Sequence, residues 1–202
     1  MPRSPRPAIN FRAISDPERI KILASPARQE LVDTLAAMGG QASAAALASQ
    51  LGRHADGLYY HLRILCKAGL IQELDGERGE ERRYRLPGDH TAPLRLAYQT
   101  GPDGNTEALH KFARGLLQVA CQDFEQALDM PDVVVDGAKR QLWAARNKAW
   151  LSAEELAEAN VLLERLCELM SRPRAPGRDL LMSCAFVLAP VTPLPLRRKA
   201  EK

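Results

Sequence analysis

Apolar residues recur at three- and four-residue spacing near the start of the chain. Leu31, Leu35 and Met38 lie on one face of a helix at this spacing, and Gly39 and Gly40 follow them directly. Ser25 and Pro26 precede the run, a pair typical of a helix N-terminus. The pattern predicts a helix over residues 27–38, and Ser15-Asp16-Pro17 predicts an earlier one by the same signals.

Two more helices and a hairpin are predicted next. Residues 43–51 form a short helical pattern that Gly52 ends, and a longer pattern over residues 55–68 places Leu58, Leu62 and Leu65 inward. Residues 70–74 and 82–86 then flank the charged, turn-rich stretch DGERGEE, which indicates two strands joined by a protruding loop.

The second half of the chain predicts helices that alternate with strands. Leu109 to Leu128 carries apolar residues at helical spacing. Residues 141–151 alternate with a period near two, which favours a strand over a helix. Ser152 and Glu155 form a capping box that opens another helix. Leu180 to Leu188 is continuously apolar, so we expect a buried strand that pairs with residues 141–151.

The predicted fold is mainly α with small β elements, an N-terminal winged helix-turn-helix followed by a helix-strand-helix-strand C-terminal region. Residues 88–104, rich in proline and glycine, read as a linker with at most a short helix at 94–98. The expected divisions are a flexible basic arm (1–14), the winged helix-turn-helix (15–87), the linker (88–104), a dimerisation and possible effector-binding region (105–190) and a basic tail (191–202). The arm is either a solvated terminus or a DNA contact.

Composition narrows the class of protein. With 46% hydrophobic and 26% charged residues, the chain suits a globular protein, and no apolar run is long enough to cross a bilayer, so we expect it in the cytoplasm. Its four cysteines stand far apart, which predicts reduced and mostly buried side chains rather than a zinc site. The net charge is only +3, so any DNA binding must depend on where the basic residues lie.

Residues 42–71 carry the strongest functional signal. They form a helix, a glycine turn and a second helix that leads through AGLI into a strand. Together with LASPARQELVDTL at residues 23–35, LASQLG at 47–52 and YYHLRIL at 59–65, this segment resembles the ArsR-type winged-helix regulators over residues 16–87. The resemblance implies a homodimeric repressor that binds double-stranded DNA and releases it when a signal binds.

By that resemblance, residues 55–63 correspond to the recognition helix, whose early exposed residues face the major groove. Arg63 and Lys67 are better placed for phosphates. Either Tyr59 or Tyr60 could pack against the wing instead of facing DNA. Side chains alternate between the two faces of the second wing strand, so Arg83 and Arg85 lie on the face opposite to that of Arg82. The candidate DNA-binding residues are His54, Asp56, Gly57, Tyr59, Tyr60, Arg63, Lys67, Arg78 and Arg82.

Other chemistry is not expected. The cysteine and histidine spacing departs from that of metal sensors, so we predict no metal and no cofactor, and we expect His61 to be structural and Cys66 to be packed rather than a redox switch. No catalytic constellation is visible, so an enzyme is not expected. The C-terminal region could supply a dimer interface, a pocket for a small apolar effector, or both. The alternative function is a winged helix that contacts protein or RNA.

Overall fold

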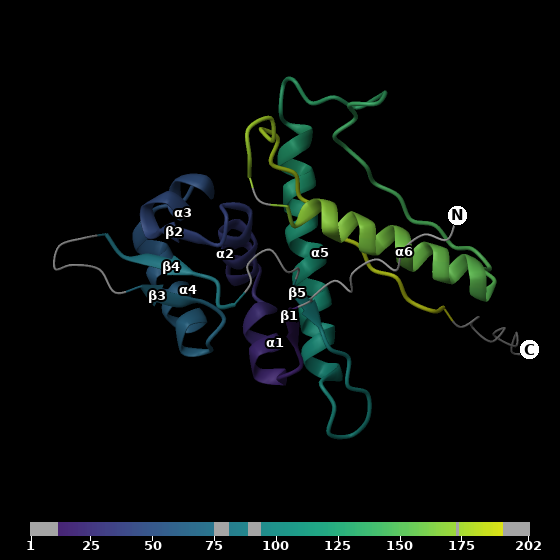
Figure 1. Ribbon diagram of the computed structural model, residues 1–202, viewed down its shortest axis with the longest axis horizontal. Helices are drawn as coiled ribbons and strands as arrows, with labels where there is room; N and C mark the ends of the chain where they lie inside the picture. The colour runs from purple at the N-terminus through teal and green to yellow at the C-terminus, as the bar shows by residue number, and fades with distance from the viewer. Residues whose placement is uncertain (1–11, 75–80, 89–93, 173, 192–202) are drawn as a thin grey trace, which may run out of the picture.

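The computed structural model describes residues 12–74, 81–88, 94–172 and 174–191 (Figure 1). Helices dominate these residues, and the strands are short. In chain order the elements are β1 (Arg12–Ile14), α1 (Pro17–Leu23), α2 (Pro26–Ala37), β2 (Gln41–Ser43), α3 (Ala44–Gln50), α4 (Ala55–Lys67), β3 (Gln72–Leu74), β4 (Arg83–Arg85), β5 (Leu94–Leu96), α5 (Thr106–Leu128) and α6 (Ala153–Met170). The predicted fold class, mainly helical with an N-terminal winged helix-turn-helix, is confirmed.

The helices of the N-terminal half begin where the sequence predicts. The Asp16 carboxylate accepts a hydrogen bond from the Glu18 amide at 3.0 Å and caps α1. The Ser43 hydroxyl does the same for α3, accepting from the Ala46 amide at 3.1 Å. The four helices bury one apolar core. Its largest fully buried apolar side chains are those of Ile20, Leu23, Leu31, Leu35, Leu47, Leu58, Leu62, Leu65 and Ile71.

The wing is a three-stranded antiparallel sheet in the order β2-β4-β3. In its register Tyr84 lies opposite Ala42 on one side and Glu73 on the other. The two hairpin strands match the prediction, and β2 joins them from the turn before α3. Residues 75–80, which include the predicted wing tip and Arg78, lie outside the described residues.

The segment predicted as a linker contains a strand where a short helix was the most we expected. β5 pairs in parallel with β1, and Arg95 is the register partner of Ala13. Asn105, only 1% exposed, ties the pair to the start of α5. Its side-chain amide donates to the carbonyl oxygens of Ser15 at 3.0 Å and Ala97 at 2.8 Å. The strand was not expected, because its pairing with residues 12–14 is a contact distant in sequence.

α5 packs against α1 and α2, so it belongs to the same body as the winged helix. Gly115 makes this contact possible. A Cβ atom there would lie 2.4 Å from the carbonyl oxygen of Ala24, which is backbone and cannot swing away. The helix spans nearly the predicted range, but its face toward the winged helix is centred on Ala108, Gly115 and Val119, and Leu117 stays exposed.

α6 begins with the predicted capping box. The Ser152 hydroxyl accepts from the Glu155 amide at 3.2 Å, and the Glu155 carboxylate accepts from the Ser152 amide at 2.7 Å. No residue of α6 is buried, and Figure 1 shows the helix projecting away from the winged helix. Glu164 of α6 forms an ion pair with Arg95 of β5, with 3.6 Å between nitrogen and oxygen.

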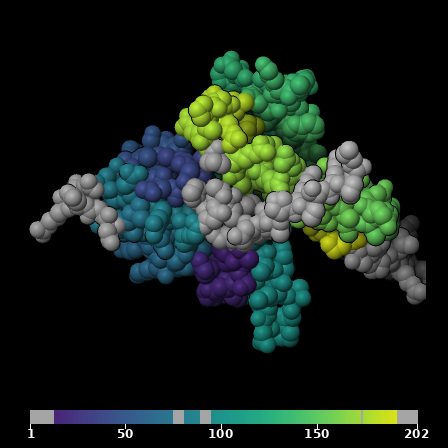
Figure 2. Space-filling view, in the orientation of Figure 1, coloured from purple at the N-terminus to yellow at the C-terminus, as the bar shows by residue number. Residues whose placement is uncertain are grey.

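The two C-terminal strands predicted from the sequence are not formed. Residues 141–151 and 180–188 contain no strand, and Leu180 and Leu181 are 72% and 66% exposed rather than buried. Within the described residues, neither 142–151 nor 179–191 has a backbone hydrogen bond to another segment. A strand requires a neighbour for its amides and carbonyls, and the described part of the chain provides no backbone partner for these segments. Figure 2 shows the C-terminal region extending beyond the compact winged helix.

Candidate nucleic-acid interface

α4 has one buried face and one polar face. Leu58, Leu62 and Leu65 are at most 2% exposed and hold the helix against the core. The opposite face is open to solvent, at i, i+4, i+7 and i+11 spacing along the helix. Its exposed residues are Asp56, Tyr60, Arg63 and Lys67.

The N-terminal end of α4 is also accessible. His54 occupies the N-cap position without a side-chain capping bond, and it is exposed. Asp56 lies in the first turn, where a negative charge suits the positive end of the helix dipole. Apart from its chain neighbours and the backbone of its own helix, no heavy atom of the described residues lies within 4 Å of the position that a Cβ at Gly57 would take. This end of the helix therefore has room to approach another surface closely.

The two tyrosines of α4 take different positions. Tyr60 is 62% exposed, and its ring meets the His61 ring edge to face at 5.3 Å between centroids. Tyr59 is half-buried and packs on the core, and the Arg82 guanidinium of the wing lies 5.9 Å from its ring centroid. Tyr59 is thus the tyrosine that faces the wing. The sequence left open whether Tyr59 or Tyr60 would do so.

The base of the wing is fastened to the first turn of α3. The Ala44 amide donates to the Arg82 carbonyl oxygen at 3.1 Å, and the Ala45 amide donates to the Glu81 carboxylate at 2.6 Å. Glu81 therefore satisfies an amide that the helix itself leaves free. No local signal identifies the bond, because the partners are 36 residues apart.

Strand alternation in β4 matches the prediction. Tyr84 points inward at 2% exposure, whereas Arg83 and Arg85 are exposed on the other face. The Arg85 guanidinium donates to the Gln72 side-chain carbonyl at 3.0 Å. Arg82, on the same face as Tyr84, is directed toward α4. The structure thus brings Tyr59, Arg63 and Arg82 together, and the other candidates of α4 line the neighbouring exposed face.

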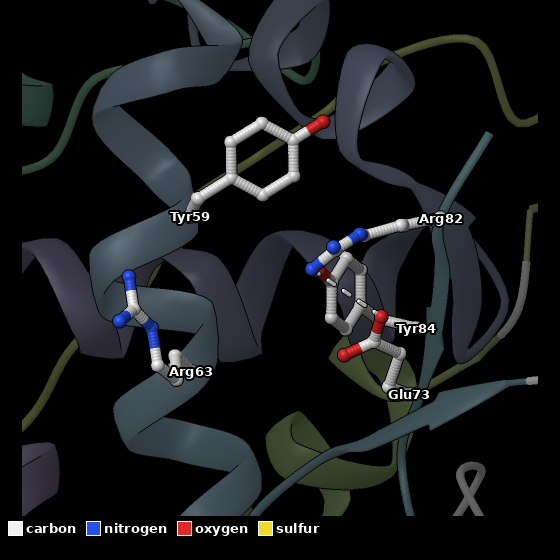
Figure 3. A pocket seen from close by; sticks show the side chains of 5 residues that line it. All are labelled: Tyr59, Arg63, Glu73, Arg82 and Tyr84. Atoms are coloured by element: carbon white, nitrogen blue, oxygen red, sulfur yellow. Dashed lines mark ion pairs between the residues drawn. The ribbon is translucent and has the colours of Figure 1, made fainter.

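An open hollow of about 380 Å³ separates α4 from the wing (Figure 3). It is lined by Tyr59, Arg63, Glu73, Arg82 and Tyr84. Arg82 and Glu73 form an ion pair with 3.6 Å between nitrogen and oxygen. Burial, followed by the nearby Glu73 carboxylate, raises the pKa of the Tyr84 hydroxyl, so this group stays a neutral phenol.

His61 faces inward. Its Nδ1 atom is buried and has no hydrogen-bond partner among the described residues. Burial lowers the pKa of the imidazole, and the positive charges of Arg28 and Arg53 lower it further. Within the described part of the chain, no group of three or more histidine, cysteine or acidic side chains is placed to hold a metal ion.

The cysteines are less buried than the sequence predicted. Cys66 and Cys167 are half-buried, and Cys121 and Cys184 are exposed. The prediction of mostly buried side chains was wrong, because Cys121 lies on the solvent-exposed side of α5 and Cys184 lies in the mostly exposed segment 179–191. Burial raises the pKa of the Cys66 thiol, and the Glu73 carboxylate adds to the effect. Both effects oppose the thiolate that a redox switch requires.

Residues 23–73 match a family model described as a helix-turn-helix domain. The chain contains a helix-turn-helix domain. The comparison with curated proteins gives no match. Among solved structures, the chain is similar to the organohalide-sensing transcriptional regulator RdhR in its 2,4-dichlorophenol-bound form, with 16% identity and a TM-score of 0.26. The alignment covers 76% of this chain and 63% of that one, so the chain spans less than two thirds of the regulator's length.

Among the described residues, no helix combines the length and the apolar character that a membrane span needs.

Proposed function

We propose that the protein is a DNA-binding transcriptional regulator of the ArsR type, a cytoplasmic homodimeric repressor that recognises an inverted repeat through α4 and the wing. One observation carries this proposal. The polar face of α4 stands free beside a wing whose base is fixed to α3 by two hydrogen bonds, from the Ala44 and Ala45 amides. A rigid helix with an adjacent basic wing suits the major groove and its flanking phosphates.

The two parts of this surface take different tasks. Tyr60, exposed early in α4, suits contact with base edges, because a phenol can hydrogen-bond and its ring can pack on a thymine methyl. Arg63, Lys67 and Arg82 carry the positive charge that phosphate contacts need. Sequence preference then depends mainly on α4, and affinity mainly on the basic residues.

The exposed apolar surface of the C-terminal region supports the dimer. Trp143 and Trp150 are 72% and 93% exposed, and Leu162 of α6 is 64% exposed. Isolated apolar residues on a surface are ordinary, but a concentration of this kind marks an interaction site. A second copy of the chain is the partner we propose, because twofold symmetry matches an inverted repeat. In such a dimer, segments of the second copy would lie beside residues 142–151 and 180–188 and pair with their backbone groups. A small apolar effector that binds this region stays a prediction.

Selection from random duplexes tests the DNA proposal. The full chain is incubated with random double-stranded DNA, and bound sequences are amplified and sequenced over several rounds. We expect an inverted repeat with half-sites about one helical turn apart. Enrichment of a single unrepeated site would contradict the symmetric dimer. An absence of enrichment, with tight binding to an RNA pool, would favour a winged helix that binds RNA.

Sedimentation of the full chain tests the dimer. Leu181→Asp places a charge on the apolar C-terminal segment and should shift the chain toward monomer at micromolar concentration. Tyr98→Asp is the matched control, because Tyr98 is 78% exposed outside that segment, and it should leave the dimer intact. A dimer equally stable in both variants would place the interface elsewhere.

A further inference from the structure

The hollow between α4 and the wing contains two positive side chains and one negative side chain. Arg63 enters it from α4 and Arg82 from the wing, and Glu73 of β3 faces Arg82 (Figure 3). The Tyr59 ring forms part of the same wall. Guanidinium and phenol groups donate hydrogen bonds, so the hollow presents a donor set that suits a phosphodiester oxygen.

The two carboxylates of the wing base play different parts. The Glu81 carboxylate accepts the Ala45 amide at 2.6 Å and completes the first turn of α3. The Glu73 carboxylate lies 3.6 Å from the Arg82 guanidinium, longer than the charge-assisted hydrogen bonds of about 2.7–2.9 Å that hold a structure together. The side chains of Arg82 and Glu73 are 65% and 47% exposed. Glu73 is therefore a loosely held counter-ion and Glu81 a structural cap.

From this arrangement we propose that the hollow is a binding site for a DNA backbone phosphate, and that the Glu73 carboxylate occupies it in the free protein and competes with the phosphate for Arg82. The inference rests on the proposed function, because it assigns a subsite and a built-in competitor to the same DNA surface. An exposed ion pair contributes little and is screened by salt, so a phosphate can displace it. Glu73 thus limits the affinity for any duplex, whatever its sequence.

Glu73→Gln removes the competing charge and keeps the size of the side chain. With the full chain and a scrambled duplex at low salt, we expect it to tighten binding by about two- to five-fold, and by less at high salt. The matched control is Glu107→Gln, which also removes the carboxylate of an exposed ion pair, with Lys111 on α5. That control should leave the affinity nearly unchanged.

Glu73→Gln in an Arg82→Ala background shows whether the gain in DNA affinity depends on Arg82. If Glu73 competes for Arg82, Glu73→Gln should add nothing once Arg82 is absent. If Glu73→Gln still tightens DNA binding when Arg82 is absent, Glu73 acts only by long-range repulsion of the DNA, and the proposal is overturned. Weaker binding by Glu73→Gln would overturn it too, because Glu73 would then orient Arg82 for DNA.

Inorganic phosphate separates this inference from the proposed function. In the isotope-labelled full chain, phosphate should shift the Arg82 side-chain NMR signal saturably, and at lower concentration in Glu73→Gln. This response supports the subsite even if random duplexes yield no operator. No shift in either protein would overturn the subsite, even if an inverted repeat emerges from the selection.

Discussion

The winged helix and the C-terminal region use apolar residues in opposite ways. Leu47, Leu62 and Leu65 of the winged helix are at most 1% exposed, whereas Leu162 and Leu180 of the C-terminal region are 64% and 72% exposed. The winged helix packs its apolar side chains within one chain, whereas the C-terminal region leaves most of its large ones exposed. The winged helix is thus specified by its own contacts, and the exposed apolar residues of the C-terminal region are those that we propose a second copy of the chain covers.

The largest expected effect separates the two regions directly. Leu62→Ala should lower the free energy of unfolding by about 2–5 kcal/mol, because it leaves a cavity in a packed core. Leu162→Ala should change the unfolding of the monomer by less than about 0.5 kcal/mol and weaken dimerisation instead. Urea unfolding at several protein concentrations measures both effects. If Leu62→Ala and Leu162→Ala lower the free energy of unfolding equally at a concentration where the chain is monomeric, the contrast between the two regions is wrong.

Asn105 tests whether β1, β5 and α5 are joined by a buried polar contact. Asn105→Ala leaves the carbonyl oxygens of Ser15 and Ala97 without this donor, so we expect a loss of about 1–3 kcal/mol in unfolding free energy. Hydrogen exchange should accelerate at the Gln99 amide, which donates to the Asn105 side chain at 3.0 Å. Asn160→Ala on exposed α6 is the control. Similar losses of unfolding free energy in both variants would show that the buried contact of Asn105 contributes no more than the exposed side chain of Asn160.

Gly115 tests how closely α5 approaches the winged helix. Gly115→Ala should destabilise the protein by about 1–2 kcal/mol net, because the clash with the Ala24 backbone exceeds the gain in helix propensity. Gly57→Ala in α4 meets no neighbour and should stabilise by up to about 1 kcal/mol. Thermal unfolding compares the two. Stabilisation by both substitutions would show that α5 does not pack as described.

The smallest expected effect is the pH dependence that His61 gives to the winged helix. The folded state lowers the pKa of His61 below its ordinary value of 6.5, so the unfolded chain binds the proton more readily. Stability from this group is present above pH 6.5 and declines as pH falls below it. Between about pH 7 and 5, the urea midpoint of His61→Gln should fall less, relative to its value at pH 7, than that of the unchanged protein. His110→Gln, exposed on α5, should keep the slope of the unchanged protein.

Local periodicity explains why the helices of the winged helix could be predicted. Leu58, Leu62 and Leu65 reveal the buried face of α4 from their spacing alone, and the capping box at Ser152 marks the start of α6. His61 was expected to be structural because it is a lone histidine within the same motif. These features depend on neighbours a few residues apart.

Contacts between distant segments could not be predicted. The cap that Glu81 supplies to α3, the parallel pairing of β1 with β5 and the turn of Tyr59 toward Arg82 all join residues far apart in sequence. Residues 141–151 and 180–188 have the composition of strands, but pairing decides whether a strand forms, and no strand partner for them occurs among the residues that the structure describes. The DNA roles of His54, Asp56, Gly57, Lys67 and the other candidates stay predictions.

We propose that Tyr60 sets the sequence preference and that Arg82 supplies affinity, and one binding measurement tests this division directly. Tyr60→Ala and Arg82→Ala are compared with the unchanged chain on the selected operator and on a scrambled duplex, across a salt series. Tyr60→Ala should weaken operator binding by about 1–3 kcal/mol with little effect on the scrambled duplex. Arg82→Ala should weaken both duplexes alike and lower the salt slope by about one. Equal losses on both duplexes for Tyr60→Ala, or a loss confined to the operator for Arg82→Ala, would contradict the claim.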